Sequence, residues 1–99
     1  MRNILLFLLL GSRGGQMRAK IILGIKKKPM NANQLSSFLA VDYKTVQHHL
    51  KILTEHNILM VIKEGKYGAL YILTPEFEKQ FSEFGEIWKQ FGNNLVKDL

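Results

Sequence analysis

Six side chains near the middle of the chain have chemistry suited to contacting nucleic acid. Their hydroxyl, amide, ammonium and imidazole groups supply donors and acceptors for base edges and phosphates. The spacings of three and four residues among them, such as Tyr43 to Gln47 and Lys44 to Gln47, are typical of positions on the same side of one helix. These candidate DNA-contacting residues are Tyr43, Lys44, Thr45, Gln47, His48 and Lys51.

The helix that would carry these residues is predicted over residues 42–57. Asp42 is a good N-cap, because its carboxylate can accept from backbone N–H groups of the first turn. Asn57 suits the helix end, because asparagine tolerates the left-handed conformation common there. An apolar stripe is formed by Val46, Leu50 and Leu53, at i, i+4 and i+7. The pattern therefore predicts one buried side and one polar, basic side.

A shorter helix is predicted just before it. Asn31 can accept from the backbone of Gln34 and begin this helix. Three of its residues have inward spacing, namely Leu35, Phe38 and Leu39. Ala40 and Val41 then form a short turn, so the two helices make a helix-turn-helix.

The segment LSSFLAVDYKTVQHHLKILTEHNIL resembles the helix-turn-helix core of ArsR-type and related archaeal winged-helix transcription regulators. The resemblance covers roughly residues 16–73, and its most specific part is TVQHHLKIL. It implies a winged helix-turn-helix fold and binding of double-stranded DNA. The chain departs from the family at Ala40, where glycine is common. If this position needs a positive φ, alanine is mildly strained there.

A β-hairpin is predicted over residues 58–73, around a turn at residues 64–68. After a recognition helix, such a hairpin is the wing of winged-helix proteins. Its tip carries Lys63, Lys66 and Tyr67, which can reach phosphates or a neighbouring minor groove. The alternative is a solvated tip, where lysine is common anyway.

The last helix is predicted to begin at Thr74, which can cap it ahead of Pro75. Large side chains then recur every three or four residues, which indicates a helix partner. These candidate dimer-interface residues are Phe77, Phe81, Phe84, Trp88, Phe91 and Leu95. Two alternatives remain: the helix folds back on its own domain, or it binds a different protein.

The N-terminal apolar run, Ile4 to Leu10, is far too short to span a bilayer. We expect a helix packed on the domain or on a second subunit rather than a signal peptide. A second helix is predicted over residues 16–26, with Met17, Ile21, Ile22 and Ile25 inward. The lysines at 26–28 either complement that helix end or contact phosphates.

The 99 residues indicate one domain, and the absence of cysteine excludes disulfides and thiolate metal sites. The net charge is +6, with +8 over residues 1–73 (eleven Lys/Arg, three Asp/Glu) and −2 over residues 74–99 (three against five). A basic body suits phosphate binding, although the charge alone also serves solubility. His48, His49 and His56 lack the companions of a metal site, and no catalytic motif is present.

These patterns predict a mainly α protein with one β-hairpin, in a single winged helix-turn-helix domain spanning residues 1–99. Its parts would be an apolar segment (1–11), a DNA-binding core (12–73) and a dimerisation helix (74–99). We expect a cytoplasmic, homodimeric, sequence-specific DNA-binding regulator that represses transcription. It would not be an enzyme, and we expect no cofactor, metal or membrane partner.

Overall fold

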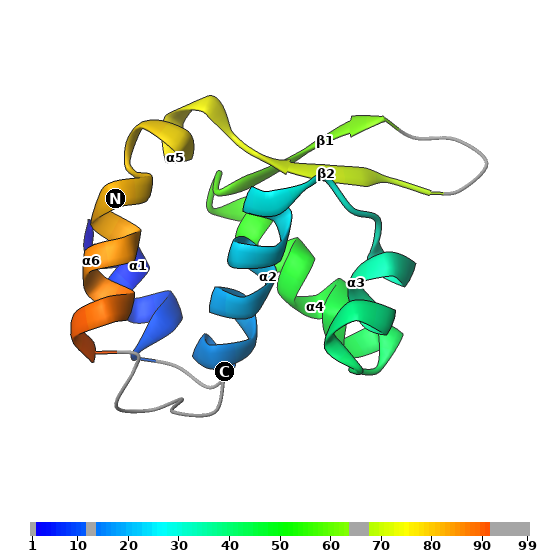
Figure 1. The fold of residues 1–99 in the computed structure, drawn as a ribbon, viewed down its shortest axis with the longest axis horizontal. Coiled ribbons are helices and arrows are strands. Elements are labelled where there is room, and N and C mark those ends of the chain that lie inside the picture. The colour runs from blue at the N-terminus through cyan, green and yellow to red at the C-terminus, as the bar shows by residue number, and fades with distance from the viewer. Residues whose placement is uncertain (1, 12–13, 64–67, 92–99) are drawn as a thin grey trace.

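The computed structural model describes residues 2–11, 14–63 and 68–91, and Figure 1 shows their arrangement. Four helices precede a two-stranded sheet and two helices follow it. Their order is α1 (Arg2–Leu9), α2 (Gly15–Lys27), α3 (Ala32–Leu39), α4 (Tyr43–Glu55), β1 (Leu59–Lys63), β2 (Leu70–Leu73), α5 (Pro75–Lys79) and α6 (Phe81–Phe91). The mainly α fold with one hairpin is as predicted.

The helix-turn-helix pair, α3 and α4, begins and ends as its polar residues predict. The Asn31 side chain accepts from the Gln34 backbone, and the Gln34 side chain accepts from the Asn31 backbone, in a reciprocal capping box. Ala40 ends α3 at a φ of 54°, and Asn57 follows α4 at a φ of 59°. Ala40 thus adopts the left-handed conformation that favours glycine.

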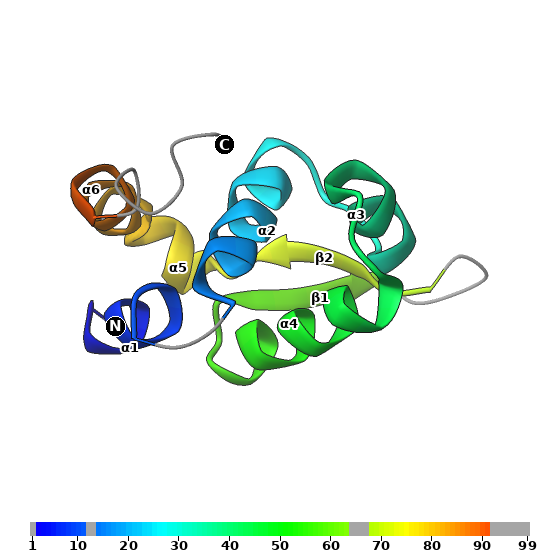
Figure 2. The same ribbon diagram turned by 90° about the horizontal axis from the view of Figure 1, so that it is seen from below.

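The hairpin lies across one face of the α2, α3 and α4 helices (Figures 1 and 2). β1 and β2 are antiparallel, with Leu59 opposite Leu73 and Val61 opposite Tyr71. The register shifts between Val61 and Lys63. The Tyr71 N–H donates to the Met30 carbonyl at 3.0 Å, so the chain before α3 covers part of the free edge of β2.

At the far end of the molecule, α1 and α6 lie side by side (Figure 2). Leu5, Leu8 and Leu9 of α1 are buried, as an apolar helix packed on the domain requires. The guanidinium of Arg18, on α2, donates to the Leu8 carbonyl at 2.8 Å and ties α1 to the core. None of the described helices combines the length and apolar character that crossing a membrane requires.

The single last helix predicted from Thr74 onward is wrong, because the chain turns at Gln80 between α5 and α6. The turn changes the helix direction, so three phenylalanine rings converge. Phe77 lies 5.9 Å from Phe84 between ring centroids, and Phe81 lies 5.4 Å from Phe84. This clustering favours folding back on the domain over a continuous heptad seam.

Phe38 also differs from its predicted inward position, since it is 60% exposed. Leu35 occupies the buried position on α3, and the Phe38 ring lies beside Gly24 of α2. A Cβ at Gly24 would stand 3.3 Å from Cε2 of Phe38, so the small residue makes room for the ring there. The inward stripe of α3 is therefore narrower than its spacing suggests.

Candidate nucleic-acid interface

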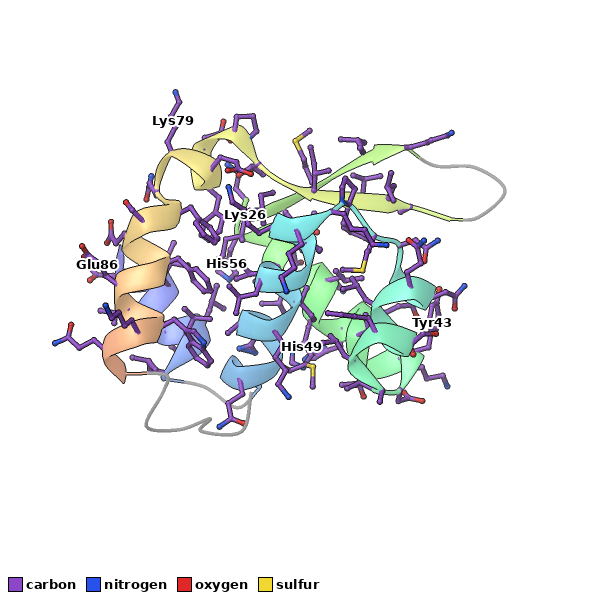
Figure 3. The ribbon with its side chains drawn as sticks, viewed as in Figure 1. Lys26, Tyr43, His49, His56, Lys79 and Glu86 are labelled. Atoms are coloured by element: carbon purple, nitrogen blue, oxygen red, sulfur yellow. The ribbon has the colours of Figure 1, made fainter. Side chains whose placement is uncertain are left out.

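The α4 helix presents the polar, basic side that the sequence predicts. Val46, Leu50 and Leu53 are buried in the core. All six predicted contact residues of this helix are exposed, namely Tyr43, Lys44, Thr45, Gln47, His48 and Lys51. Figure 3 shows Tyr43 projecting at the α3–α4 end of the molecule, beside the hairpin.

The first turn of α4 is held by its cap. Oδ2 of Asp42 accepts from the backbone N–H of Lys44 at 3.0 Å and of Thr45 at 3.2 Å. These bonds satisfy two of the donors that a helix start leaves unpaired. The backbone that carries Tyr43, Lys44 and Thr45 is therefore fixed before any ligand binds.

One side-chain hydrogen bond lies on the exposed side of α4. Nε2 of Gln47 donates to the hydroxyl oxygen of Tyr43 at 3.0 Å, one helical turn away. Both side chains line a small polar hollow of about 80 Å³ between the start of α3, the start of α4 and the base of β2. Asn31 and Tyr71 line its other sides. Three elements thus converge around Gln47.

The wing contributes one described residue to this face. Lys63 is exposed at the end of β1. Lys66 and Tyr67, also predicted as wing contacts, lie outside the described residues. The two strands place the hairpin end beside α3 and the start of α4 (Figure 1). Lys63 ends β1 and Lys44 is the second residue of α4, whereas Lys51 lies about two turns further along that helix.

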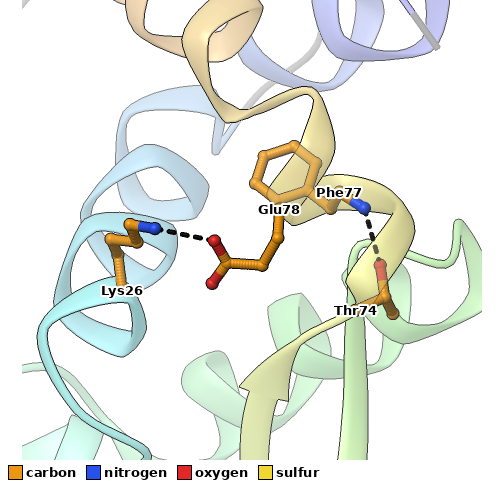
Figure 4. Close-up of polar contacts among 4 residues, drawn as sticks. All are labelled: Lys26, Thr74, Phe77 and Glu78. Carbon is orange, nitrogen blue, oxygen red and sulfur yellow. Dashed lines mark hydrogen bonds and ion pairs between the residues drawn. The ribbon is translucent and has the colours of Figure 1, made fainter.

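The lysine run that ends α2 divides between two roles. Nζ of Lys26 pairs with Oε2 of Glu78 at 2.7 Å (Figure 4). The same Nζ lies 4.7 Å from the centroid of the Phe81 ring. Figure 4 also shows the Thr74 hydroxyl accepting from the Phe77 N–H, the cap that starts α5. Lys26 thus joins α2 to the last helices, whereas Lys27 and Lys28 are exposed.

The histidines differ in their surroundings. His48 and His56 are exposed, whereas His49 is buried against the start of α2. Burial, followed by repulsion from Arg18 and His48, lowers the pKa of His49 from 6.5 to about 4. Within the described part of the chain, no three His, Asp or Glu side chains are grouped to hold a metal ion. His48 is exposed, as are the other five predicted contact residues of α4.

The predicted interface residues fall into three groups. Phe77 and Phe84 are fully buried in the chain's own core, so their rings do not reach the surface. Phe81 and Trp88 are partly buried. The side chains of Phe91 and Leu95 lie outside the description. Among the described side chains, only Phe81 and Trp88 of these six residues therefore have surface left that a second subunit could contact.

The sequence predicted that the apolar run Ile4 to Leu10 packs on the domain or on a second subunit, but not which of its residues stay exposed. Ile4 is 41% exposed and Phe7 is 58% exposed, beside α6. A Cβ built at Gly85 of α6 would meet nothing within 4 Å, so the surface there is open. The spacing of three between Ile4 and Phe7 was available as a signal, but a continuous apolar run obscures which of its sides is outward.

Comparisons with known proteins agree with this geometry. The family model "Bacterial regulatory protein, arsR family" matches residues 15–61. A search of curated proteins finds no match.

Several solved structures share the fold. The transcriptional regulator BldR from Sulfolobus solfataricus is 16% identical, with a TM-score of 0.71 over 99% of this chain and 70% of that one. A probable transcriptional regulator from Pseudomonas aeruginosa is 15% identical, with a TM-score of 0.72 over 99% and 76%. The transcriptional repressor BigR from Xylella fastidiosa is 17% identical, with a TM-score of 0.67 over 94% and 89%.

The matched segment contains α2, α3 and α4 and ends within β1, so it includes the complete helix-turn-helix. The chain is therefore a winged helix-turn-helix protein in fold, and its residues 15–61 are similar to the arsR family of bacterial regulatory proteins.

Proposed function

We propose that this protein is a cytoplasmic, sequence-specific DNA-binding repressor that acts as a homodimer. The observation that carries the proposal is the two-sided α4 helix. Its apolar side is anchored in the core, and its outer side carries the exposed aromatic, polar and basic side chains of the six contact residues. A helix of this kind fits the major groove, which is wide enough to admit it.

Each side chain has a role that its chemistry suits. Gln47 bonds an adenine bidentately, and Lys44 and His48 reach acceptors such as N7 and O6 of guanine. Tyr43 contacts a phosphate or a thymine methyl group. Thr45 and Lys51, with the wing lysines Lys63 and Lys66, bond phosphates and hold the register. Tyr67 at the wing tip reaches the backbone or the minor groove.

The dimer forms through the α1–α6 end of the molecule. Ile4 and Phe7 of α1 expose apolar surface, and Phe81 and Trp88 of the neighbouring α6 are partly buried. A second copy of the chain covers this surface and places two α4 helices about 34 Å apart. The operator is then a near-palindrome with half-sites about 10 base pairs apart, centre to centre.

Sedimentation of paired variants tests the dimer. Phe7→Glu should convert the dimer to a monomer, because it places a charge in the apolar contact. Phe38→Glu is the matched control, since Phe38 is equally exposed but lies on α3. A parent protein that is monomeric at micromolar concentration would contradict the homodimer and favour a different protein as the partner of α6.

Selection from a random duplex library tests sequence specificity. The parent protein should enrich a near-palindrome, and Gln47→Ala should lose preference at one base pair in each half-site, by roughly 1–3 kcal/mol. Equal losses on selected and random DNA would contradict base reading by Gln47. Repression is tested by placing the selected operator within a promoter and measuring transcription in vitro. A transcription rate that rises with added protein would contradict the repressor assignment.

A further inference from the structure

The bond between Gln47 and Tyr43 gives Tyr43 a role that the proposed function does not assign. The two residues are four apart on α4, so their side chains meet on one side of the helix. Nε2 of Gln47 donates to the Tyr43 hydroxyl at 3.0 Å. We propose that Tyr43 is a positioning residue that holds the Gln47 amide ready to read one base pair. This inference rests on the proposed function of α4.

The anchor for this bond is rigid. Tyr43 is the first residue of α4, directly after the Asp42 cap, whose carboxylate fixes the backbone of the first turn. Its phenol ring has only two side-chain torsions, so little freedom is lost in holding it still. A glutamine side chain has three torsions and loses more entropy when it is ordered. Tyr43 therefore orders its more flexible neighbour before DNA arrives.

The hydrogen-bond capacity of Gln47 survives this bond. A glutamine amide has two N–H donors and one oxygen acceptor, and a phenol hydroxyl can both accept and donate. One N–H of Gln47 is directed to Tyr43. The second N–H and the Oε1 oxygen are the donor and acceptor that bidentate recognition of adenine uses. The tyrosine proton stays available to donate to a phosphate or a base acceptor.

The surroundings restrict Gln47 further. Gln47 and Tyr43 form one wall of the small polar hollow, opposite Asn31 and Tyr71. The hollow is small, about 80 Å³, and Gln47 keeps an exposed side toward solvent. The start of α3 and the start of β2 thus lie close to one side of the Gln47 side chain, and the bond to Tyr43 is the contact that orients the amide.

The test compares Tyr43→Phe with the parent protein on selected and mismatched DNA. Phenylalanine keeps the ring and removes only the hydroxyl group. At the base pair whose preference depends on Gln47, discrimination should fall by about two- to tenfold, the effect of losing one hydrogen bond of ordinary strength. Loss of a phosphate contact by the hydroxyl would weaken binding to every sequence equally, so discrimination is measured as the ratio of affinities for selected and mismatched DNA. The thermal unfolding midpoint should stay within error of the parent value.

The double variant separates positioning from direct contact. If Tyr43 acts through Gln47, Tyr43→Phe should change nothing at that base pair in a Gln47→Ala background. An unchanged preference in the single Tyr43→Phe variant would overturn the inference. So would an equal loss in both backgrounds, because Tyr43 would then read the DNA by itself.

A measurement without DNA distinguishes this inference from the function on which it rests. In the free protein, ¹⁵N relaxation of the Gln47 side-chain amide should show more motion in Tyr43→Phe than in the parent, with the exposed Gln90 of α6 as the reference. Equal mobility in the two proteins would overturn the positioning role whatever the DNA results. Failure of the parent protein to bind DNA would instead overturn the proposed function.

Discussion

The buried His49 makes the stability of this protein depend on pH. Its ring lies against the start of α2, where a Cβ at Gly14 would collide with it, and its Nδ1 finds no hydrogen-bond partner among the described residues. Arg18 of α2 and the neighbouring His48 are the cations that repel a proton there. In the folded protein the pKa of His49 is about 4, against 6.5 in an unfolded chain.

The sign of the effect follows from where the proton binds. Above pH 6.5 both states are neutral at this ring, and stability is at its full value. Between pH 6.5 and 4 the unfolded chain takes up a proton that the folded protein excludes. The free energy of unfolding therefore decreases as the pH is lowered through this range. Each pH unit in this window costs about 1.4 kcal/mol, and the loss reaches about 3 kcal/mol near pH 4. That is a large part of the stability of a domain this size.

Urea unfolding at pH 7, 5.5 and 4 measures this loss. His49→Gln removes the titrating group while keeping a polar side chain. Between pH 7 and pH 4 the parent should therefore lose about 3 kcal/mol more unfolding free energy than His49→Gln loses. The exposed His48 supplies the control, since His48→Gln should follow the parent curve except for a small effect on His49. Parallel pH curves for the parent and His49→Gln would refute the reasoning.

Two further predictions concern the ends of the helix-turn-helix helices. Asp42→Ala should destabilise the protein by about 1 kcal/mol, because it removes the cap of α4, whereas Asp42→Ser should keep most of the stability. Urea unfolding measures the stability of both variants. Equal losses of stability in the two variants would contradict a capping role for Asp42. Ala40→Gly should stabilise the protein by about 0.5 kcal/mol, because relief of roughly 1–2 kcal/mol of left-handed strain exceeds the roughly 0.4–1 kcal/mol of added unfolded-state entropy. A lower thermal midpoint for this variant would contradict the strain.

Local rules predicted the helix-turn-helix well. Asn31, Asp42 and Thr74 cap the helices that their side chains suggest, and Asn57 has the positive φ expected of it. These features depend on a few neighbouring residues, so a sequence contains the information that determines them. The resemblance carried by TVQHHLKIL agreed with the family match and the fold.

Contacts between distant segments were not predictable in the same way. Lys26 and Glu78 are 52 residues apart, and nothing local indicates that they pair. The turn at Gln80 was also not predictable from neighbouring residues. The spacing of Phe77, Phe81 and Phe84 is compatible with one unbroken helix as well as with the two helices observed. Only the packing of α6 beside α1 decides between a continuous helix and a broken one. The exposed Phe38 likewise depends on Gly24 in another helix.

The most direct test of DNA binding by α4 is the salt dependence of affinity, measured by fluorescence anisotropy on duplex DNA. Parent affinity should fall steeply with salt. Lys51→Ala/Lys63→Ala removes two proposed phosphate contacts and should flatten the logarithmic slope by about 1.8, or about 0.9 for each lysine that no longer displaces a counterion from the duplex. Lys26→Ala should keep the parent slope, because Lys26 pairs with Glu78 away from the interface. Absence of salt-sensitive binding by the parent, or the same slope in the double variant, would contradict the account.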